Sequence, residues 1–290
     1  MKQIAVLKGV TKRYKEFTLN GIDLGVPTGQ IVGIIGPNGA GKTTTLQLMM
    51  NMVRLDGGEI TIFGKHYPQD EKEIKNRIGY VGEVQYFYED RTVAWTGKFV
   101  SKFYSNWNEG EFTALLKRFD LSRTKRVKNL SKGMRVKLAF AIALAHHPKL
   151  IILDEPTSGL DPVVRREVLE LLKERSLQDE ELSIIISSHI TDDLERIADV
   201  VHYMINGTIV LSGDKDLLLD TWKKVHFKAD AVSEEMLDGL RNVERNMFGV
   251  SGITNRYQDF KASFGDAIQR GDIRVENIRL DDILISLLEK

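Results

Sequence analysis

The chain has 290 residues, 42% of them hydrophobic, which is enough for one large globular domain or a domain with an appendage. Lys plus Arg and Asp plus Glu both number 41, so no overall electrostatic field favours nucleic acid or an anionic membrane surface. The sequence contains no cysteine, which excludes disulfides and thiolate metal sites and suits a reducing compartment.

Two further features bear on the compartment. The longest uninterrupted apolar run, residues 138–145, is far shorter than the roughly 20 residues needed to cross a bilayer. The N-terminus has no long apolar segment followed by small residues, as a signal peptide would. We therefore expect a protein that works inside the cell and does not span a membrane.

The first predicted elements are short strands. Residues 3–7 and 21–26 open the chain, and the second of these alternates apolar with other residues. Residues 31–35, 150–153 and 183–187 differ because apolar residues run through them almost without interruption. Such runs are typical of parallel strands that are buried on both faces, so the sequence predicts a parallel sheet covered by helices.

A phosphate-binding motif follows the strand at 31–35. The pattern G-x-x-x-x-G-K-T places Gly36, Gly41, Lys42 and Thr43 between that strand and the start of a helix, with Thr44 next. Backbone N–H groups of such a loop point at phosphate oxygens, and the helix adds the positive end of its dipole. We predict that Lys42 contacts the β- and γ-phosphates and that the Thr43 hydroxyl holds Mg²⁺.

Residues 80–148 have a helical texture, with two unusual concentrations of side chains. Residues 80–107 contain nine of the chain's 23 aromatic residues, which form either a protein interface or the core of the helices. Residues 117–137 carry nine cations against one acid, which attract phosphates or anionic lipid heads or simply form a solvated face. Ser131 and Gly133 lie within this run, directly before a helix that we expect to end at His147, because Pro148 follows.

Two later strands end in polar residues suited to nucleotide hydrolysis. Asp154 follows four apolar residues and can bind Mg²⁺ directly or through water. Glu155 is placed to orient the attacking water and accept its proton. His189 follows the strand at 183–187, and the carboxyl ends of such strands line the ligand crevice, so His189 is expected to donate to a γ-phosphate oxygen.

The rest of the chain lacks motifs of this kind. A helix is predicted to begin at Pro162 with Asp161 as its N-cap. Residues 213–290 contain no catalytic-looking motif and end in a predicted amphipathic helix, so we interpret them as an accessory region. The apolar face of that last helix would be formed by Leu280, Ile283, Leu284, Leu287 and Leu288.

These residues, in this order, resemble the ATP-binding cassette family over about residues 1–212. The stretch LSKGM, residues 130–134, lies where that family carries its signature sequence, usually LSGGQ. The resemblance implies an α/β fold: a P-loop NTPase core with a parallel or mixed sheet, an antiparallel N-terminal β-subdomain and a helical signature subdomain at about 85–148. The small accessory region at 213–290 lies outside it.

The resemblance also assigns roles. It implies that Ser131 and Gly133 bind the γ-phosphate of ATP held by a second subunit, and that Ser158 and Asp161 belong to the D-loop between the two sites. Glu155 and His189 would be catalytic, and Mg²⁺ would be held by Thr43, Asp154 and Glu83. The implied ATP-binding residues within one chain are Tyr14, Gly36, Asn38, Gly39, Ala40, Gly41, Lys42, Thr43 and Thr44.

Two departures from the family pattern are visible. Lys132 and Met134 replace the usual Gly and Gln of the signature, from which we expect altered affinity and not loss of function. In the coupling loop, where the family usually has Gln, the aligned residue is Glu83, and Gln85 follows two residues later. The sequence leaves open which of the two takes the coupling role.

The resemblance therefore predicts the ATP-hydrolysing subunit of a bacterial ABC transporter at the cytoplasmic face of the membrane. It would dimerise around two ATP, with an identical or different second subunit, and drive separately encoded transmembrane permease subunits, with export favoured. No nucleic-acid partner is expected. The alternative is a soluble ABC ATPase acting on ribosomes or DNA. The substrate is not readable from the sequence.

Overall fold

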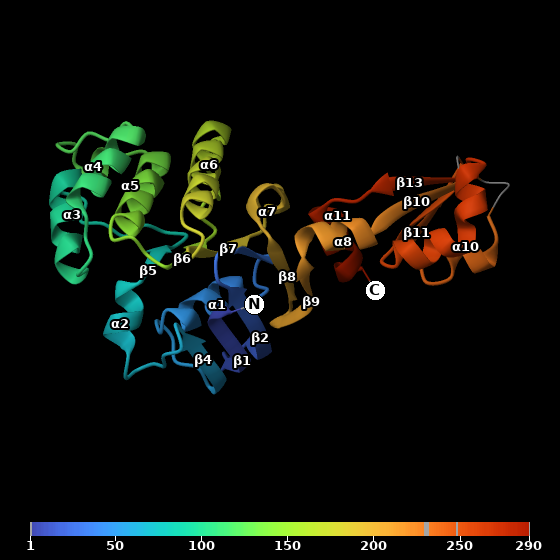
Figure 1. Ribbon diagram of the computed structural model, residues 1–290, viewed down its shortest axis with the longest axis horizontal. Coiled ribbons are helices and arrows are strands. Elements are labelled where there is room, and N and C mark those ends of the chain that lie inside the picture. Colours follow the sequence, from blue (N-terminus) through green and yellow to red (C-terminus); the bar gives the residue numbers. More distant parts are fainter. Residues whose placement is uncertain (1, 229–231, 248, 290) are drawn as a thin grey trace. The chain divides into compact units, whose positions relative to one another are not determined.

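The computed structural model describes residues 2–228, 232–247 and 249–289, and the chain divides into two compact units. The first unit extends to Leu211 and the second begins at Ser212. The elements of both are labelled in Figure 1.

The first unit contains a small antiparallel sheet near the N-terminus. Its strand order is β2-β1-β4, and β1 pairs antiparallel with both neighbours. Apolar side chains such as Leu7, Val10 and Leu19 are fully buried on its inner face. The antiparallel N-terminal subdomain expected from the sequence is thus present. Its strands are β1 (Gln3–Arg13), β2 (Thr18–Pro27) and β4 (Gly57–Ile62).

A six-stranded sheet forms the centre of the first unit, in the order β5-β6-β7-β3-β8-β9. The first five strands in this order are parallel, and every residue of β3, β6 and β7 is buried, as the apolar runs predicted. The register pairs Ile35 with Ser188 and Asp154 with Ser187, so these strands end at the same edge. The strands are β3 (Ile31–Ile35), β5 (Ile78–Val81), β6 (Leu150–Asp154), β7 (Ser183–Ser188), β8 (Val200–Ile205) and β9 (Thr208–Asp214).

The first unit also contains helices. One group of these helices lies side by side (Figure 1). In that group α5 contacts α3, α4 and strand β5. It ends three residues short of the predicted stop at His147, where the backbone is already left-handed (φ 52°). The helices are α1 (Lys42–Met49), α2 (Glu71–Asn76), α3 (Val93–Val100), the 3₁₀ turns η1 (Ser101–Phe103) and η2 (Val127–Asn129), α4 (Glu109–Arg118), α5 (Lys132–Leu144), α6 (Pro162–Gln178) and α7 (Thr191–Ile197).

The second unit has its own antiparallel sheet, in the order β11-β12-β10-β13, and its own core around Val225, Phe227 and Phe260. The predicted final helix is present, but Leu288 of its predicted apolar face is 45% exposed, whereas Ser286, outside that face, is buried. The elements are α8 (Lys215–Thr221), β10 (Lys223–Lys228), α9 (Glu234–Leu237), β11 (Arg241–Asn246), β12 (Gly249–Thr254), α10 (Tyr257–Gln269), β13 (Ile273–Asn277) and α11 (Leu280–Leu288).

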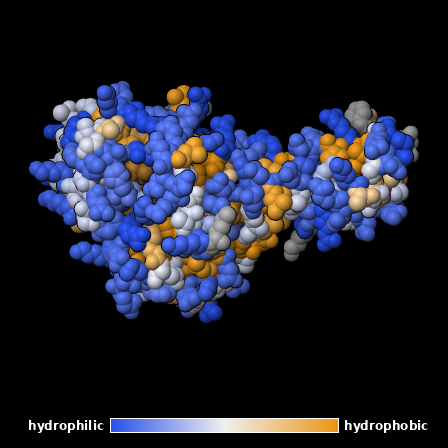
Figure 2. Space-filling model, in the orientation of Figure 1, coloured by the Kyte–Doolittle hydropathy of each residue, from blue (hydrophilic) through white to orange (hydrophobic). Residues whose placement is uncertain are grey.

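The surface is mainly polar on the face drawn in Figure 2, where hydrophilic residues outnumber hydrophobic ones. None of the helices in the described parts of the chain combines the length and apolar character that crossing a bilayer requires.

Candidate nucleotide site

The loop between β3 and α1 makes close backbone contacts that require glycine. A Cβ on Gly36 would lie 2.2 Å from the carbonyl oxygen of Met204. Gly41, the residue before α1, has φ +110°, and a Cβ there would lie 2.8 Å from Leu19 Cδ1. These two positions let the loop curl against β8 and β2 and turn directly into the first turn of α1. The N-terminus of α1 is the kind of helix end that binds phosphate.

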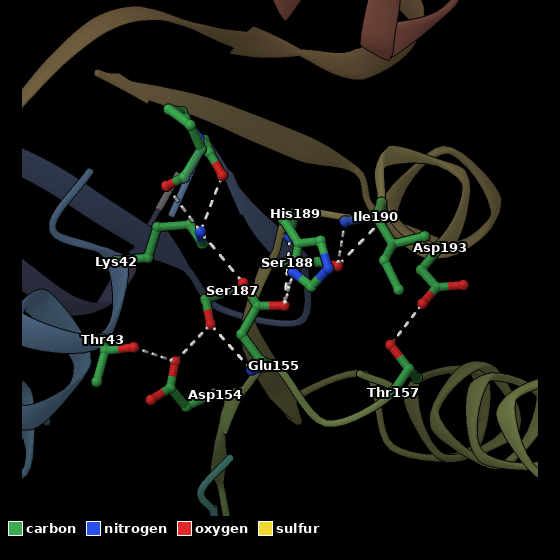
Figure 3. Close-up of polar contacts among 12 residues, drawn as sticks. Lys42, Thr43, Asp154, Glu155, Thr157, Ser187, Ser188, His189, Ile190 and Asp193 are labelled. Atoms are coloured by element: carbon green, nitrogen blue, oxygen red, sulfur yellow. Dashed lines mark hydrogen bonds and ion pairs between the residues drawn. The ribbon is translucent and has the colours of Figure 1, made fainter. Parts of the chain in front are cut away.

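Lys42 is the first residue of α1, and its side chain is only 5% exposed. The Nζ atom donates to the carbonyl oxygens of Gly36 at 2.8 Å and Pro37 at 3.2 Å. It also lies 3.1 Å from Oε1 of Glu155 (Figure 3). A buried cation is therefore fixed at the start of the helix, beside the loop that would surround a phosphate.

Asp154 at the end of β6 is joined to the same loop by hydrogen bonds. Its Oδ1 atom accepts from the Thr43 hydroxyl at 3.0 Å and from the Ser187 hydroxyl at 2.7 Å (Figure 3). Burial raises the pKa of Asp154, the two hydrogen bonds oppose that rise, and the negative charges of Glu155 and Glu83 add to it. The site thus contains more negative charge than its own hydrogen bonds stabilise, and a cation would relieve this.

Glu155 connects the strand end of β6 with that of β7. Its backbone is left-handed (φ 47°), a conformation that costs a non-glycine residue of order 1–3 kcal/mol, and its N–H donates to the Ser187 hydroxyl at 3.0 Å. Oε2 lies 2.7 Å from Nδ1 of His189, and Oε1 faces Lys42. Such strain is often found at functional sites. Here the strained backbone places the buried carboxylate of Glu155 beside Lys42 of the P-loop.

These groups surround a cavity of about 720 Å³, within the range of small-molecule sites. Of the residues predicted from the sequence, the lining includes the P-loop from Asn38 to Thr44 together with Glu83, Glu155, Ser158 and His189. Asp154 lies just behind the lining, in contact with Thr43. The cavity can therefore hold a polyphosphate at the helix end with a carboxylate and an imidazole beside it.

The aromatic residue at this cavity is not the one that the sequence indicated. Phe17 and Glu16 line the cavity, whereas Tyr14 does not; it is 45% exposed and lies under the ammonium of Lys12 at 5.6 Å. Tyr14 and Phe17 face each other across the turn between β1 and β2, where the Tyr14 N–H donates to the Phe17 carbonyl. The sequence contains both aromatic residues, with Phe17 three positions after Tyr14, but nothing in it indicates which of the two lies at the cavity.

The structure separates the two candidates of the coupling loop. Glu83 lines the cavity. The side-chain amide of Gln85 donates to the carbonyl oxygen of Gly82 at 2.8 Å and to that of Glu83 at 3.4 Å. Glu83 is therefore the residue whose carboxylate can reach a ligand or its metal ion, and Gln85 stabilises the shape of its own loop.

The signature residues lie elsewhere. Ser131 is the N-cap of α5, and its hydroxyl accepts from the Met134 N–H at 3.3 Å. A Cβ on Gly133 would lie 3.3 Å from Val164, and one on Gly159 would lie 2.5 Å from Nζ of Lys132. The signature thus packs against the D-loop and the start of α6, where Asp161 caps the Val163 and Val164 N–H groups at 3.1 Å. Ser131, Gly133 and Asp161 do not line the cavity.

An aromatic surface occurs in the helical subdomain, formed by Tyr88, Trp95, Phe99 and Phe103. The rings of Trp95 and Phe99 stack at 5.1 Å, and Tyr88 meets both edge-on. Tyr88 is 60% exposed and Phe103 is 64% exposed, so this group is a surface and not a closed core. Of the other aromatic residues at 80–107, Tyr86 is 89% exposed, and the remaining ones are partly buried, so the region combines exposed rings with partly covered ones.

The basic run is largely neutralised within the chain. Arg135 makes two hydrogen bonds to the carboxylate of Glu89, and Lys128 lies 2.8 Å from Asp90. Arg118, Arg123 and Lys137 are likewise paired, with Glu174, Glu109 and Glu167. The pairing favours a solvated, cross-linked surface over a patch for anionic partners.

Comparison with known proteins agrees with this geometry. Residues 19–158 match the family model described as "ABC transporter". The chain is 35% identical to the bacitracin transport ATP-binding protein BcrA of Bacillus licheniformis over 72% of this chain and 69% of that protein. It is 32% identical to the lantibiotic transport ATP-binding protein SrtF of Streptococcus pyogenes, over 72% of this chain and 90% of that protein. A structure described as an ATP-binding subunit of an ABC transporter superposes with a TM-score of 0.68 at 27% identity, covering 75% of this chain and 92% of that one.

Proposed function

Because this chain belongs to the ABC transporter family and is one of its ATPases, we propose that it powers export as a dimer bound to separately encoded membrane subunits. One observation carries the proposal: the cavity brings the P-loop, Glu155, His189 and Glu83 together while leaving the signature residues outside. The site supplies most of what phosphoryl transfer to water requires, and in this proposal the signature of a second chain supplies the rest.

Each residue at the cavity has a distinct task in hydrolysis. The loop amides and Lys42 bind and orient the phosphates, and the positive charge of Lys42 stabilises negative charge on the transferred group. Glu155 orients the attacking water and accepts its proton, a role worth on the order of 10²–10⁴ in rate. His189 lies 2.7 Å from Glu155, so it fixes that carboxylate and lies within reach of the terminal phosphate.

The residues present fit a Mg²⁺ ion. Thr43 and Asp154 are in direct contact, Glu83 lines the same cavity, and the pKa of Asp154 is raised because its charge is buried near two other carboxylates. No cluster of three or more acidic, histidine or cysteine side chains suited to a metal occurs in the described residues, so phosphate and water oxygens would complete the shell. When bound, Mg²⁺ would supply charge neutralisation at the phosphates.

The signature residues support the proposal of a dimer. Ser131 and Gly133 are at the exposed start of α5 and do not reach the cavity of their own chain. A helix N-terminus with a capping serine is suited to bind an anion, and a second subunit would bring its signature onto this chain's ATP. The site would then be shared between chains, and binding of ATP would close the dimer.

The aromatic surface supports the proposal of membrane partners. Exposed aromatic groups of this kind are enriched at protein interfaces, and Arg91 lies 4.9 Å above the Trp95 ring. We assign this surface to the transmembrane permease, which would place the chain at the cytoplasmic face of the membrane. The curated relatives described above are named as transport proteins, which favours transport over the ribosomal or DNA alternative.

The proposal is tested most simply at Glu155. Glu155→Gln should lower the turnover number for ATP by a factor on the order of 10²–10⁴, because the amide cannot accept the proton, and should leave ATP bound. Lys42→Ala is the matched control, which should lose ATP binding itself. Size-exclusion chromatography with ATP should show Glu155→Gln as a dimer. Wild-type turnover in Glu155→Gln would refute the assigned base, and a persistent monomer with ATP would refute the shared site.

A further inference from the structure

A second link between the two catalytic loops lies behind the cavity, at Asp193 of α7. Its Oδ2 atom accepts from the Thr157 hydroxyl at 2.6 Å, and its Oδ1 atom accepts from Nε of Arg165 at 2.5 Å. The side chain of Asp193 is 1% exposed and Thr157 is buried. Figure 3 shows this bond apart from the contacts of Glu155 and His189. One buried carboxylate thus joins α7, α6 and the segment after β6.

The positions of these residues in the chain show which two loops the link joins. Thr157 follows Glu155 by two residues, and Asp193 follows His189 by four. The two loops are therefore joined twice, once at the cavity by Glu155 and His189 and once behind it by Thr157 and Asp193. Neither Thr157 nor Asp193 lines the cavity, so the second link can remain intact while groups at the cavity bind and release nucleotide.

The catalytic loop needs such support because its own geometry is strained. Glu155 has a left-handed backbone, and its two carboxylate oxygens face different partners, Lys42 and His189. A general base works only when it is held within hydrogen-bond reach of the water it activates, and a misplacement of 1 Å can cost about 10²-fold in rate. A charge-assisted hydrogen bond in a buried setting is stronger and more rigid than one at the surface.

We propose that Asp193 is a positioning residue: through Thr157 and Arg165 it holds the segment 155–158, which carries Glu155 and Ser158, in fixed relation to His189. The proposal rests on the function proposed for Glu155. It makes Asp193 part of the hydrolytic machinery without contact to ATP. Ser158, on the D-loop, is held by Asp193 in the same way. A movement of α7 would therefore shift both Glu155 and the D-loop.

The test compares Thr157→Val with Thr157→Ser. Valine has the shape of threonine but no hydroxyl, and serine keeps the hydroxyl. Steady-state hydrolysis should show the turnover number of Thr157→Val lowered about tenfold or more with KM for ATP within about twofold of wild type, because the P-loop still binds ATP. Thr157→Ser should recover most of the turnover. Thermal unfolding with saturating ATP confirms that the fraction of folded protein is equal.

Three results would overturn the proposal: wild-type turnover in Thr157→Val, equal slowing in Thr157→Ser, or a loss of activity fully accounted for by unfolded protein. If Thr157→Val does not fold, Arg165→Gln carries the same test, since Arg165 is partly exposed and its loss removes the second donor to Asp193. Glu155→Gln is assayed in parallel. If Glu155→Gln is inactive and Thr157→Val is normal, only the positioning role fails; if Glu155→Gln is active, the proposed function fails.

Discussion

The two functional motifs of the first unit are built in opposite ways. The P-loop half is buried, with Lys42, Asp154 and Glu155 each less than 10% exposed and each joined to another strand end. The signature half consists of Ser131 and its neighbours at the exposed start of α5, where the Ser131 hydroxyl caps the helix. The difference agrees with the proposal that one chain binds ATP through its buried half and presents its signature motif to a second chain.

The parallel sheet explains the buried half. Strands β3, β6 and β7 end in register, so the residues that follow them meet at one edge although they are far apart in the sequence. The signature half depends on the N-terminus of α5 and on its packing against α6, which involve no strand. Replacing one side chain should therefore lower ATP turnover strongly in the buried half and less strongly at the edge of that half.

Among the residues at the edge of the buried half, those of the coupling loop should show the largest effect on ATP turnover. Glu83→Ala should lower turnover about tenfold, because it removes the side-chain oxygens that line the cavity, whereas Gln85→Ala should change it far less. Glu83→Gln, which restores the residue usual in the family, serves as the control and should retain most activity. A coupled-enzyme ATPase assay distinguishes the variants. A greater loss in Gln85→Ala would transfer the coupling role to Gln85.

A smaller effect is expected on the stability of the protein in acid. His146 lies just after α5, its Nε2 lies 3.1 Å from the Ile78 carbonyl oxygen at the start of β5, and burial lowers its pKa to about 4. Between pH 6.5 and 4 the unfolded chain binds a proton there that the folded chain does not, so stability falls as pH falls, by about 1.4 kcal/mol per pH unit.

His146→Gln keeps a donor for Ile78 and removes this proton. Chemical denaturation at pH 7.5 and pH 5 should show a smaller loss of stability on acidification than in wild type, where His202, whose pKa is also lowered to about 4 by burial, adds its own share. An unchanged dependence on pH would mean that His146 is not buried as a neutral ring.

Much of the first unit was predictable because its motifs carry their own structural context. The strand, glycine loop and helix at 31–49 predicted the phosphate site, and the apolar runs predicted which strands are buried. The sequence could not show that Phe17 lines the cavity and Tyr14 does not, or that Glu83 does and Gln85 does not. Which residue lines the cavity depends on where a turn or loop lies relative to it. The link from Thr157 to Asp193 spans 36 positions and has no local signal.

The second unit shows the limit of sequence reasoning more plainly. Its final helix was predicted from periodicity, but its four-stranded sheet was not, since its strands are short and contain only one or two apolar residues each. In α11 Leu288, which periodicity placed on the apolar face, is exposed and Ser286 is buried, because packing within the unit decides which side chains fit.

The central claim is that one chain's signature completes the site of another, and a mixing experiment tests it most directly. Lys42→Ala and Ser131→Arg should each be inactive alone, because one cannot bind ATP and the other places a bulky side chain at the γ-phosphate. In an equal mixture, half of the dimers would pair an intact P-loop with an intact signature at one of two sites, so about a quarter of wild-type activity should return. No recovery in a mixture that forms dimers would contradict the shared site.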